Sequence, residues 1–309
     1  MSRTRKAQTG MVCLINISIE REFAMASLED EFGDIIKKAR QGQSLTLEDV
    51  IDKTGITETT LRALEGCKQP PTSNEVQAIA LFLSLDSQTL ETIGREQWQP
   101  LASPDWVAET VETVRGDIGG YEVKGYLIYD STTKDAVMID TAYNPKQMLQ
   151  RIDVLELRLN GICLTHGHSD HAYGIDTVVA IHPTTVYIGQ GDMSMVTEYR
   201  SSMDIQPARD GHILKIGSID LRFMATPGHT PGGVCYSTNP LCFVGDTLFA
   251  GSIGRSCPAT LYSIHLQSVK ERILRMDESV VLLPGHGPAT TVGEEKRHNP
   301  FVTGQALPS

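Results

Sequence analysis

Apolar residues recur three or four positions apart before residue 98, and this spacing predicts a set of amphipathic helices. Helix by helix, the apolar positions are Ile35, Ile36 and Ala39; Leu47, Val50 and Ile51; Leu61 and Leu64; and Val76, Ile79, Ala80 and Leu83. Thr46, with Asp49 three residues on, predicts the N-cap of the second helix, and Thr57 predicts that of the third. Gly55 lies between these two helices, where a helix-turn-helix needs a tight turn.

After residue 105 the pattern changes to short β-rich runs. Residues 121–130 and 135–140 are joined by the polar turn Ser-Thr-Thr-Lys, and they predict a β-hairpin. Residues 212–226 and 233–246 repeat this style, and helical segments are expected at about residues 145–158, 172–181, 191–200 and 261–276. The alternation of strands and helices predicts an α/β layered domain with its functional groups on loops at the strand ends.

The two patterns meet at residues 94–106, which contain two prolines and both tryptophans of the chain. We therefore expect a helix-turn-helix domain over residues 27–98 and a larger α/β domain over residues 99–309. The apolar run at residues 11–19 is followed by Glu-Arg-Glu rather than by a small-residue cleavage site, so residues 1–26 are expected to form a flexible extension. A second translation start at Met25 is equally compatible with the sequence.

Composition narrows the class of protein. The 309 residues carry a net charge of −11, which argues against a protein whose main activity is nonspecific binding to nucleic acid or to an anionic membrane. No apolar run approaches the ~20 residues of a membrane span. The six cysteines are scattered without a Cys-x-x-Cys motif, which is typical of a protein of the reducing cytoplasm.

Three of the nine histidines fall within six positions, at His166, His168 and His171, with Asp170 among them. They follow the buried-strand pattern Ile-Cys-Leu-Thr, so they are expected on the loop that leaves a strand. Imidazoles and carboxylates are preferred ligands of zinc, iron and manganese, and packing does not explain four of them together. Three further candidates follow apolar strands, namely His229, Asp246 and His286. The sequence therefore supplies seven candidate metal ligands.

In this order, the seven residues resemble the signature of the metallo-β-lactamase superfamily, and from about residue 107 to 302 the chain resembles its glyoxalase II-like hydrolases. Residues 245–255 also look like glyoxalase II, and residues 284–301 resemble the tail of its short, single-domain relatives. The resemblance implies an αββα fold, preceded here by the small all-α helix-turn-helix domain. It also implies two divalent metal ions as cofactors, with zinc as the first choice and iron or manganese as alternatives.

The same resemblance assigns roles to the seven residues. His166, His168 and His229 would bind one ion, Asp170, His171 and His286 the other, and Asp246 would bridge the two. Asp170 and Asp246 are therefore the expected catalytic carboxylates. The β-lactamases of the superfamily lack a bridging acid at the position of Asp246, which argues against antibiotic hydrolysis.

Two such ions ~3.5–4 Å apart lower the pKa of water to ~7 and so supply a metal-bound hydroxide as nucleophile at neutral pH. A thioester suits this site because its thiolate, with a thiol pKa of ~8.5, leaves without a strong general acid. We therefore expect the substrate to be a thioester of the S-acylglutathione type. Two departures bear on glutathione recognition: the chain is expected to lack the C-terminal helical domain of glyoxalase II, and Gly233 stands where many glyoxalases have a further histidine.

The same ligands are compatible with other activities. A persulfide dioxygenase would hold one iron with ligands drawn from His166, His168, His229 and Asp246. The acidic residue that this branch tends to carry soon after its Gly-Arg pair is absent, because Arg255 is followed by Ser-Cys-Pro-Ala-Thr. A lactonase is a second alternative. A third is a transcriptional regulator, whose metal domain senses or destroys a metabolite while its helical domain acts on DNA.

Residues 44–90 resemble the Cro-repressor-type helix-turn-helix family along essentially their whole length, on the Thr54-Gly55-Ile56 turn and the Pro70-Pro71 break. The resemblance implies a five-helix fold with residues 57–66 as the recognition helix, and DNA contacts through residues 44–70 that include Arg62 and Lys68. Residues 27–98 carry seven Lys and Arg against thirteen Asp and Glu, so phosphate binding would be weak unless the protein forms a homodimer. A docking or dimerisation module is the alternative.

Overall fold

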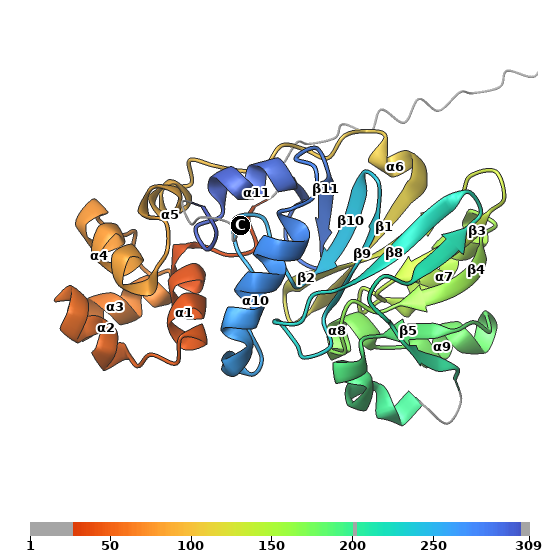
Figure 1. Ribbon diagram of the computed structural model, residues 1–309, viewed down its shortest axis with the longest axis horizontal. Helices are drawn as coiled ribbons and strands as arrows, with labels where there is room; N and C mark the ends of the chain where they lie inside the picture. The colour runs from red at the N-terminus through yellow and green to blue at the C-terminus, as the bar shows by residue number, and fades with distance from the viewer. Residues whose placement is uncertain (1–26, 200–202, 304–309) are drawn as a thin grey trace, which may run out of the picture.

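The computed structural model describes residues 27–199 and 203–303, and the strands within them form two six-stranded sheets that face each other (Figure 1). The first sheet has the order β1 (Val111–Ile118), β2 (Tyr121–Tyr129), β3 (Asp135–Ile139), β4 (Arg158–Cys163), β5 (Val186–Ile188) and β6 (Ile205–Pro207). The second has the order β12 (Thr290–Thr291), β11 (Val281–Pro284), β10 (Leu241–Gly245), β9 (Val234–Thr238), β8 (Ile219–Ala225) and β7 (Ile213–Ile216). The strands predicted within residues 121–140 and 212–246 are confirmed.

Apolar side chains divide the α/β part into layers. Ile139 and Phe243 belong to a core between the two sheets. Met148 lies in a second core, between the first sheet and the outer helices α7 (Pro145–Val154) and α9 (Ile175–Ile181). The outer face of the second sheet is covered by α10 (Tyr262–Ser268), the π-helical turn η3 (Val269–Ile273) and α11 (Val292–His298). The predicted αββα architecture is confirmed (Figure 1).

The remaining helices correct two details of the prediction. The segment expected to be helical over residues 172–181 consists of α8 (Ser169–Ala172) and α9, because Gly174 takes a left-handed backbone conformation with φ 75° and interrupts the helix. The segment at 191–200 corresponds to a kinked 3-10 helix, η1 (Gln190–Tyr199), and a further 3-10 turn, η2 (Ala259–Leu261), precedes α10. No helix among the described residues is long and apolar enough to cross a membrane.

Five short helices form the N-terminal part, which we call the helical module (residues 27–98). They are α1 (Phe32–Gly42), α2 (Leu47–Thr54), α3 (Glu58–Glu65), α4 (Ser73–Leu83) and α5 (Ser87–Gly94). Thr46 and Thr57 cap α2 and α3 as predicted, and Gly55 has the left-handed conformation that the tight turn needs, with φ 72°. The extension predicted for residues 1–26, with its second start at Met25, lies outside the described residues.

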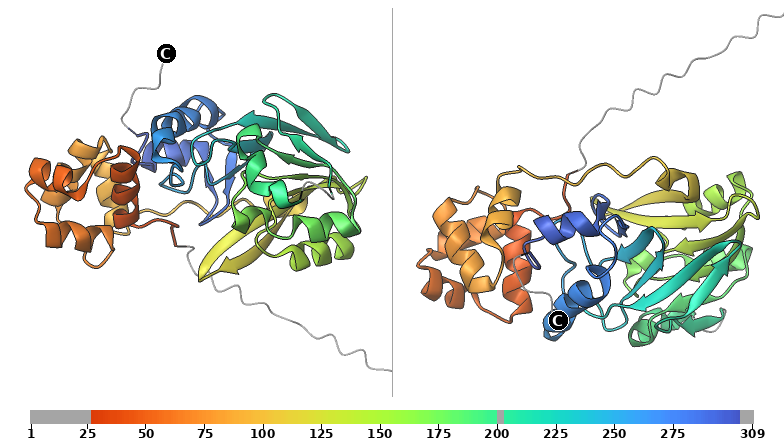
Figure 2. Two further views of the ribbon diagram at one scale, coloured as in Figure 1. Left: turned by 90° about the horizontal axis from the view of Figure 1, so that it is seen from below. Right: turned by 45° about the horizontal axis from the view of Figure 1, so that its top comes forward.

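The helical module packs directly against the outer helices of the α/β part (Figure 2). Phe32 and Ile36 of the module belong to the same apolar cluster as Val269 and Phe301. The ring of Trp98 stacks on that of His298, with 4.8 Å between their centroids. The predicted boundary at residue 98 falls in the stretch that joins α5 to the short helix α6 (Val107–Thr110), and apolar packing continues across it.

Candidate metal centre

The directions of the strands bring the candidate ligands to one edge of the two sheets. In the second sheet β10 is parallel to β11, and β9 is antiparallel to both β8 and β10, so β8, β10 and β11 all run the same way. His229, Asp246 and His286 follow the carboxyl ends of these three strands. In the first sheet β4 leads into the loop with His166 and His168, and Asp170 and His171 lie on α8. All seven candidates therefore come from strand ends that meet.

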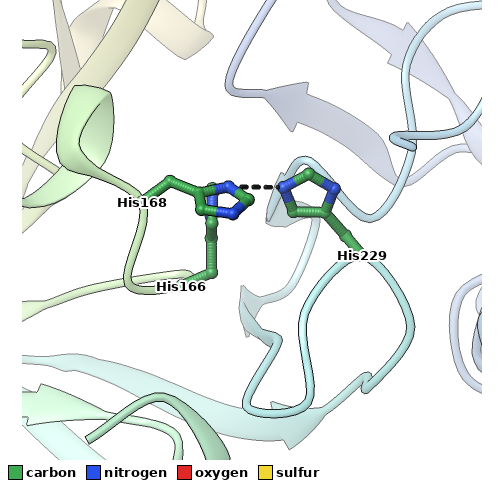
Figure 3. Close-up of side chains that lie close together, drawn as sticks. All are labelled: His166, His168 and His229. Atoms are coloured by element: carbon green, nitrogen blue, oxygen red, sulfur yellow. Dashed lines mark hydrogen bonds between the residues drawn. The ribbon is translucent and has the colours of Figure 1, made fainter. Parts of the chain in front are cut away.

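The candidates form three groups, and within each group the ligand atoms all lie within 4.8 Å of one another. His166, His168 and His229 form one group (Figure 3), Asp170, His171 and His286 form another, and Asp246 forms the third with His166 and His171. Oδ1 of Asp246 is 3.4 Å from Nε2 of His171, and Oδ2 is 3.5 Å from Nε2 of His229. One carboxylate thus reaches both histidine sets with different oxygens, as a bridging ligand requires.

The spacing of these atoms and their lack of partners fit metal ions. Two ligand atoms ~2.1 Å from a tetrahedral ion lie ~3.4 Å apart, and Nε2 of His286 lies 3.4 Å from Asp170 and 3.7 Å from Asp246. Nε2 of His166, Nε2 of His171 and Oδ1 of Asp246 are buried without a hydrogen-bond partner. Because unpaired buried polar atoms are costly, cations held among them would satisfy all three.

Hydrogen bonds on the far side of three rings determine which nitrogen faces the centre. Nδ1 donates to Asp140 over 2.8 Å in His171, to the Arg255 carbonyl over 2.7 Å in His229, and to the Glu122 carbonyl over 2.6 Å in His286. Each of these bonds leaves Nε2 directed at the other ligands. Asp140 was not among the predicted residues; its only signal is its position directly after β3, which pairs in parallel with β4.

The charges of the ligands depend on burial and on one another. Burial acts to raise the pKa of Asp246, but the charges of His171 and His286 outweigh it and lower the pKa, so this carboxylate is ionised at neutral pH. Burial lowers the pKa of His229 to about 4, so this ring is neutral. Burial also acts to lower the pKa of His171, yet Asp246 and Asp140 raise it above its ordinary value. An incoming cation must therefore displace a proton from His171.

Asp192 connects the two loops that carry the first histidine set. Its buried carboxylate accepts hydrogen bonds from the backbone N–H of Gly167 over 3.1 Å, from Thr230 Oγ1 over 2.6 Å and from the N–H of Gly232 over 2.7 Å. Gly167 lies between two ligands and Thr230 directly follows a third. In the sequence Asp192 looks like any acid of a surface helix, so its role had no signal there.

The remaining predicted residues lie away from the centre. Arg62 and Lys68 are exposed on the helical module, and Arg62 forms an ion pair with Glu58 over 2.7 Å. The other histidines, His182, His212, His265 and His298, belong to none of the three groups. His265 is fully buried, with Nε2 2.8 Å from the carbonyl oxygen of Thr247, so it has a packing role.

Comparisons with known proteins agree with this geometry. Residues 118–286, which include all seven candidate ligands, match the family described as Metallo-beta-lactamase superfamily. An uncharacterized protein of Mycobacterium leprae is 33% identical over 206 residues, which cover 58% of this chain and 93% of its own. Hydroxyacylglutathione hydrolase GloC of Haemophilus influenzae is 31% identical over 198 residues, covering 58% of this chain and 92% of its own.

Three solved structures extend the comparison. BLEG-1 B3 metallo-beta-lactamase is 28% identical with a TM-score of 0.54, and the match covers 62% of this chain and 100% of that one. ETHE1 from Myxococcus xanthus is 26% identical with a TM-score of 0.54, and the match covers 63% of this chain and 86% of that one. TTHA1623 in a di-iron-bound form is 27% identical with a TM-score of 0.53, and the match covers 61% of this chain and 100% of that one.

Proposed function

Because the chain belongs to the metallo-beta-lactamase superfamily, we propose that it is a metal-dependent hydrolase of thioesters of the S-acylglutathione type. The observation that carries the proposal is the position of Asp246, whose two oxygens each reach a histidine of a different ligand set. The similarity to the hydroxyacylglutathione hydrolase of Haemophilus influenzae supports thioesters as the substrate class.

The seven residues would hold two divalent ions. His166, His168 and His229 form one site, Asp170, His171 and His286 the other, and Asp246 is shared. Zinc is the first choice for such nitrogen and oxygen donors, and the likeness to the di-iron form of TTHA1623 supports iron as the alternative. When bound, the ions would activate water as a nucleophile and polarise the thioester carbonyl.

The protein groups then orient the reactants. The side chain of Asp170 is 21% exposed against 9% for Asp246, so Asp170 is the carboxylate open to the approaching substrate and solvent. Its ionised oxygens accept a hydrogen bond from the attacking water and direct it toward the carbonyl carbon. The thiolate, with a thiol pKa of ~8.5, leaves without a strong general acid.

Thiol release from a panel of thioesters, S-lactoylglutathione included, tests this function, with His168→Ala as the blank. We expect turnover by the wild-type protein and none by the variant, whose metal content should also fall. Retained turnover in a variant with normal metal content would overturn the assignment of the site. A wild-type protein that releases no thiol from any thioester would overturn the substrate class.

The second candidate is a persulfide dioxygenase, which the structural likeness to ETHE1 from Myxococcus xanthus favours. Oxygen uptake by the iron-loaded protein with glutathione persulfide as substrate tests this activity. Lactones complete the panel, and a β-lactam is included because of the likeness to BLEG-1. The bridging position of Asp246 argues against the β-lactam.

For the helical module we propose DNA binding by residues 44–70, with Arg62 and Lys68 as contacts in a homodimer. The support is the arrangement of α2, the left-handed Gly55 and α3, which lie on the side of the module away from the sheets (Figure 1). Fluorescence anisotropy with duplex DNA at low salt tests the proposal. Binding that is absent, or that Arg62→Ala leaves unchanged, contradicts it.

A further inference from the structure

The loop after Asp246 connects the shared carboxylate to a second ligand. We call residues 246–257 the ligand loop. Near its far end the carbonyl of Arg255 accepts the hydrogen bond from Nδ1 of His229, and the N–H of Cys257 donates to the carbonyl of His229 over 2.9 Å. Gly254 packs back on the start of the loop, where a Cβ would lie 1.9 Å from the carbonyl oxygen of Asp246. A displacement of this loop would therefore move both His229 and Asp246.

The helical module holds the middle of the ligand loop through two polar contacts. Ser252 Oγ donates to the carboxylate of Asp30 over 2.5 Å, and Nζ of Lys38 donates to the carbonyl of Ile253 over 2.9 Å. Asp30 and Lys38 also pair with each other over 2.5 Å. Asn299, the residue that directly follows α11, donates to the carbonyl of Ser252 over 2.9 Å. The loop is thus held by the module and by Asn299.

Lys38 is also linked to His286 through the ring of Phe249. Its Nζ lies 4.8 Å from the centroid of the Phe249 ring, and that ring meets His286 nearly edge to face, with 5.8 Å between the two centroids. The pair formed by Asp30 and Lys38 therefore contacts the ligand loop, which adjoins His229 and Asp246, and the ring of Phe249, which adjoins His286.

Attachment of the helical module to the α/β part does not explain the pair formed by Asp30 and Lys38. Asp30 is only 6% exposed, and burying a charge costs free energy that its partner offsets only when the geometry is good. The apolar cluster shared by Phe32, Ile36, Val269 and Phe301 already attaches the module to the α/β part. DNA binding does not require the pair either, because the two residues lie before and on α1, whereas α2 and α3 form the helix-turn-helix. What the pair adds is a fixed position for the ligand loop.

We propose that the helical module is a working part of the hydrolase: Asp30 and Lys38 are positioning residues that fix the ligand loop and, through it, His229 and Asp246. The proposal rests on the proposed hydrolase function for its activity readout. Its metal-site readout is independent of the substrate, so the two can fail separately.

The test compares Asp30→Asn with a matched variant, Glu65→Gln, in the full chain. Glu65 pairs with Arg40 over 2.5 Å inside the module and is 9% exposed at its side chain, so the second variant also replaces a buried, paired acid by its amide, but away from the loop. We expect Asp30→Asn to lower kcat about tenfold, the loss of one charged hydrogen bond, while KM changes little. The visible absorption of the cobalt-substituted protein should shift, and one ion should leave faster to a chelator. Glu65→Gln should leave kcat, the cobalt spectrum and the rate of ion release at wild-type values.

Ser252→Ala keeps the test decisive should Asp30→Asn fail to fold, because it removes the same contact without leaving a buried charge unpaired. It should shift the cobalt spectrum in the same direction. Wild-type kcat and cobalt spectra in the folded variants overturn the proposal, and so does an equal loss in Glu65→Gln, which would indicate module stability alone. A wild-type protein without thioester activity would overturn the proposed function, while the spectra would still decide the role of Asp30.

Discussion

The carboxylate of Asp140 accepts a hydrogen bond from Nδ1 of His171 over 2.8 Å, although 31 residues separate the two along the chain. The same carboxylate accepts bonds from the N–H and the hydroxyl of Thr165, each over 2.7 Å. Asp140 takes the left-handed conformation, with φ 56°, which is strained for a residue with a side chain. This strain, together with the pairing of β3 and β4, indicates that the carboxylate is held in place to orient the His171 ring.

We predict that Asp140→Asn weakens binding of the ion at Asp170, His171 and His286 by about 10–100-fold, the usual effect of losing a carboxylate behind a histidine ligand. Competition with a chromogenic chelator measures the affinity. Asp130→Asn is the matched control, because Asp130 also follows a strand and accepts bonds from Ser218, Thr132 and Thr133, away from the centre. Equal affinities in the wild type and Asp140→Asn would refute the prediction.

The affinity of this ion should also depend on pH. Burial acts to lower the pKa of His171, but Asp246 and Asp140 raise it above the ordinary 6.5, so at lower pH the ring carries a proton that the metal must displace. The pKa of His286, the second histidine of this ion, is also raised. We predict that affinity increases with pH by about tenfold per unit for each proton displaced, so by up to about a hundredfold per unit where both rings are protonated, and that it levels off once both pKa values are passed. Chelator competition from pH 5.5 to 8.5, corrected for the protonation of the chelator, measures this slope. A flat profile below pH 7 would contradict the assignment of the proton.

The sequence predicted the parts of the molecule that depend on local pattern. The seven candidate ligands were identifiable because His and Asp follow apolar strands, and Thr46, Thr57 and Gly55 specify their caps and turn within a few residues. Asp140 and Asp192 were missed because their partners are set by strand pairing and loop packing. The contact between Asp30 and Ser252 spans 222 positions, and nothing in either segment indicates the other. β1 was not predicted, since polar residues such as Arg115 and Asp117 weaken its apolar alternation.

Glu295 gives a prediction about stability. It is fully buried on α11, and burial raises its pKa to about 8, although Asn299, Thr290 and the N–H of Gly251 donate hydrogen bonds to it. Since the folded pKa lies above the unfolded value, the folded state binds the proton more tightly. The stabilisation is therefore complete below the unfolded pKa of about 4.5 and is lost as the pH rises through about 8.

We predict that Glu295→Gln, which resembles the neutral acid, loses less stability between pH 6 and pH 9 than the wild type does. The difference in the shift of Tm should be about 5 °C or more. Thermal unfolding of the metal-free proteins at the two pH values measures it, and metal-free protein is used so that metal loss does not contribute. Equal shifts of Tm in the two proteins would show that Glu295 is already ionised at pH 6.

Glu29 places a charge of the helical module beside the metal centre. Its Cβ lies 2.8 Å from the position that a Cβ on Gly287, the neighbour of His286, would take. Burial raises the pKa of Glu29, with His286 acting in the opposite direction. Within residues 27–199 and 203–303 no hydrogen bond or salt bridge engages this carboxylate. The nearby cations have other partners, since Lys38 pairs with Asp30 over 2.5 Å and Lys124 with Glu122 over 3.6 Å.

An unpaired negative charge at this position should repel thioesters whose thiol is anionic. We predict that Glu29→Gln raises kcat/KM for such a thioester about threefold to fivefold relative to a thioester with the same acyl group and a neutral thiol, the scale of one screened charge at the edge of a site. Glu48→Gln removes the same charge from an exposed position on α2 and should leave the ratio unchanged. Thiol release at pH 8 and low ionic strength, repeated at high salt, measures both ratios. Because repulsion between charges is screened by salt, the difference between the ratios of Glu29→Gln and the wild type should shrink at high salt. A ratio of the two kcat/KM values that is equal in all three proteins would place Glu29 outside the path of the substrate. A difference that salt does not change would lead to the same conclusion.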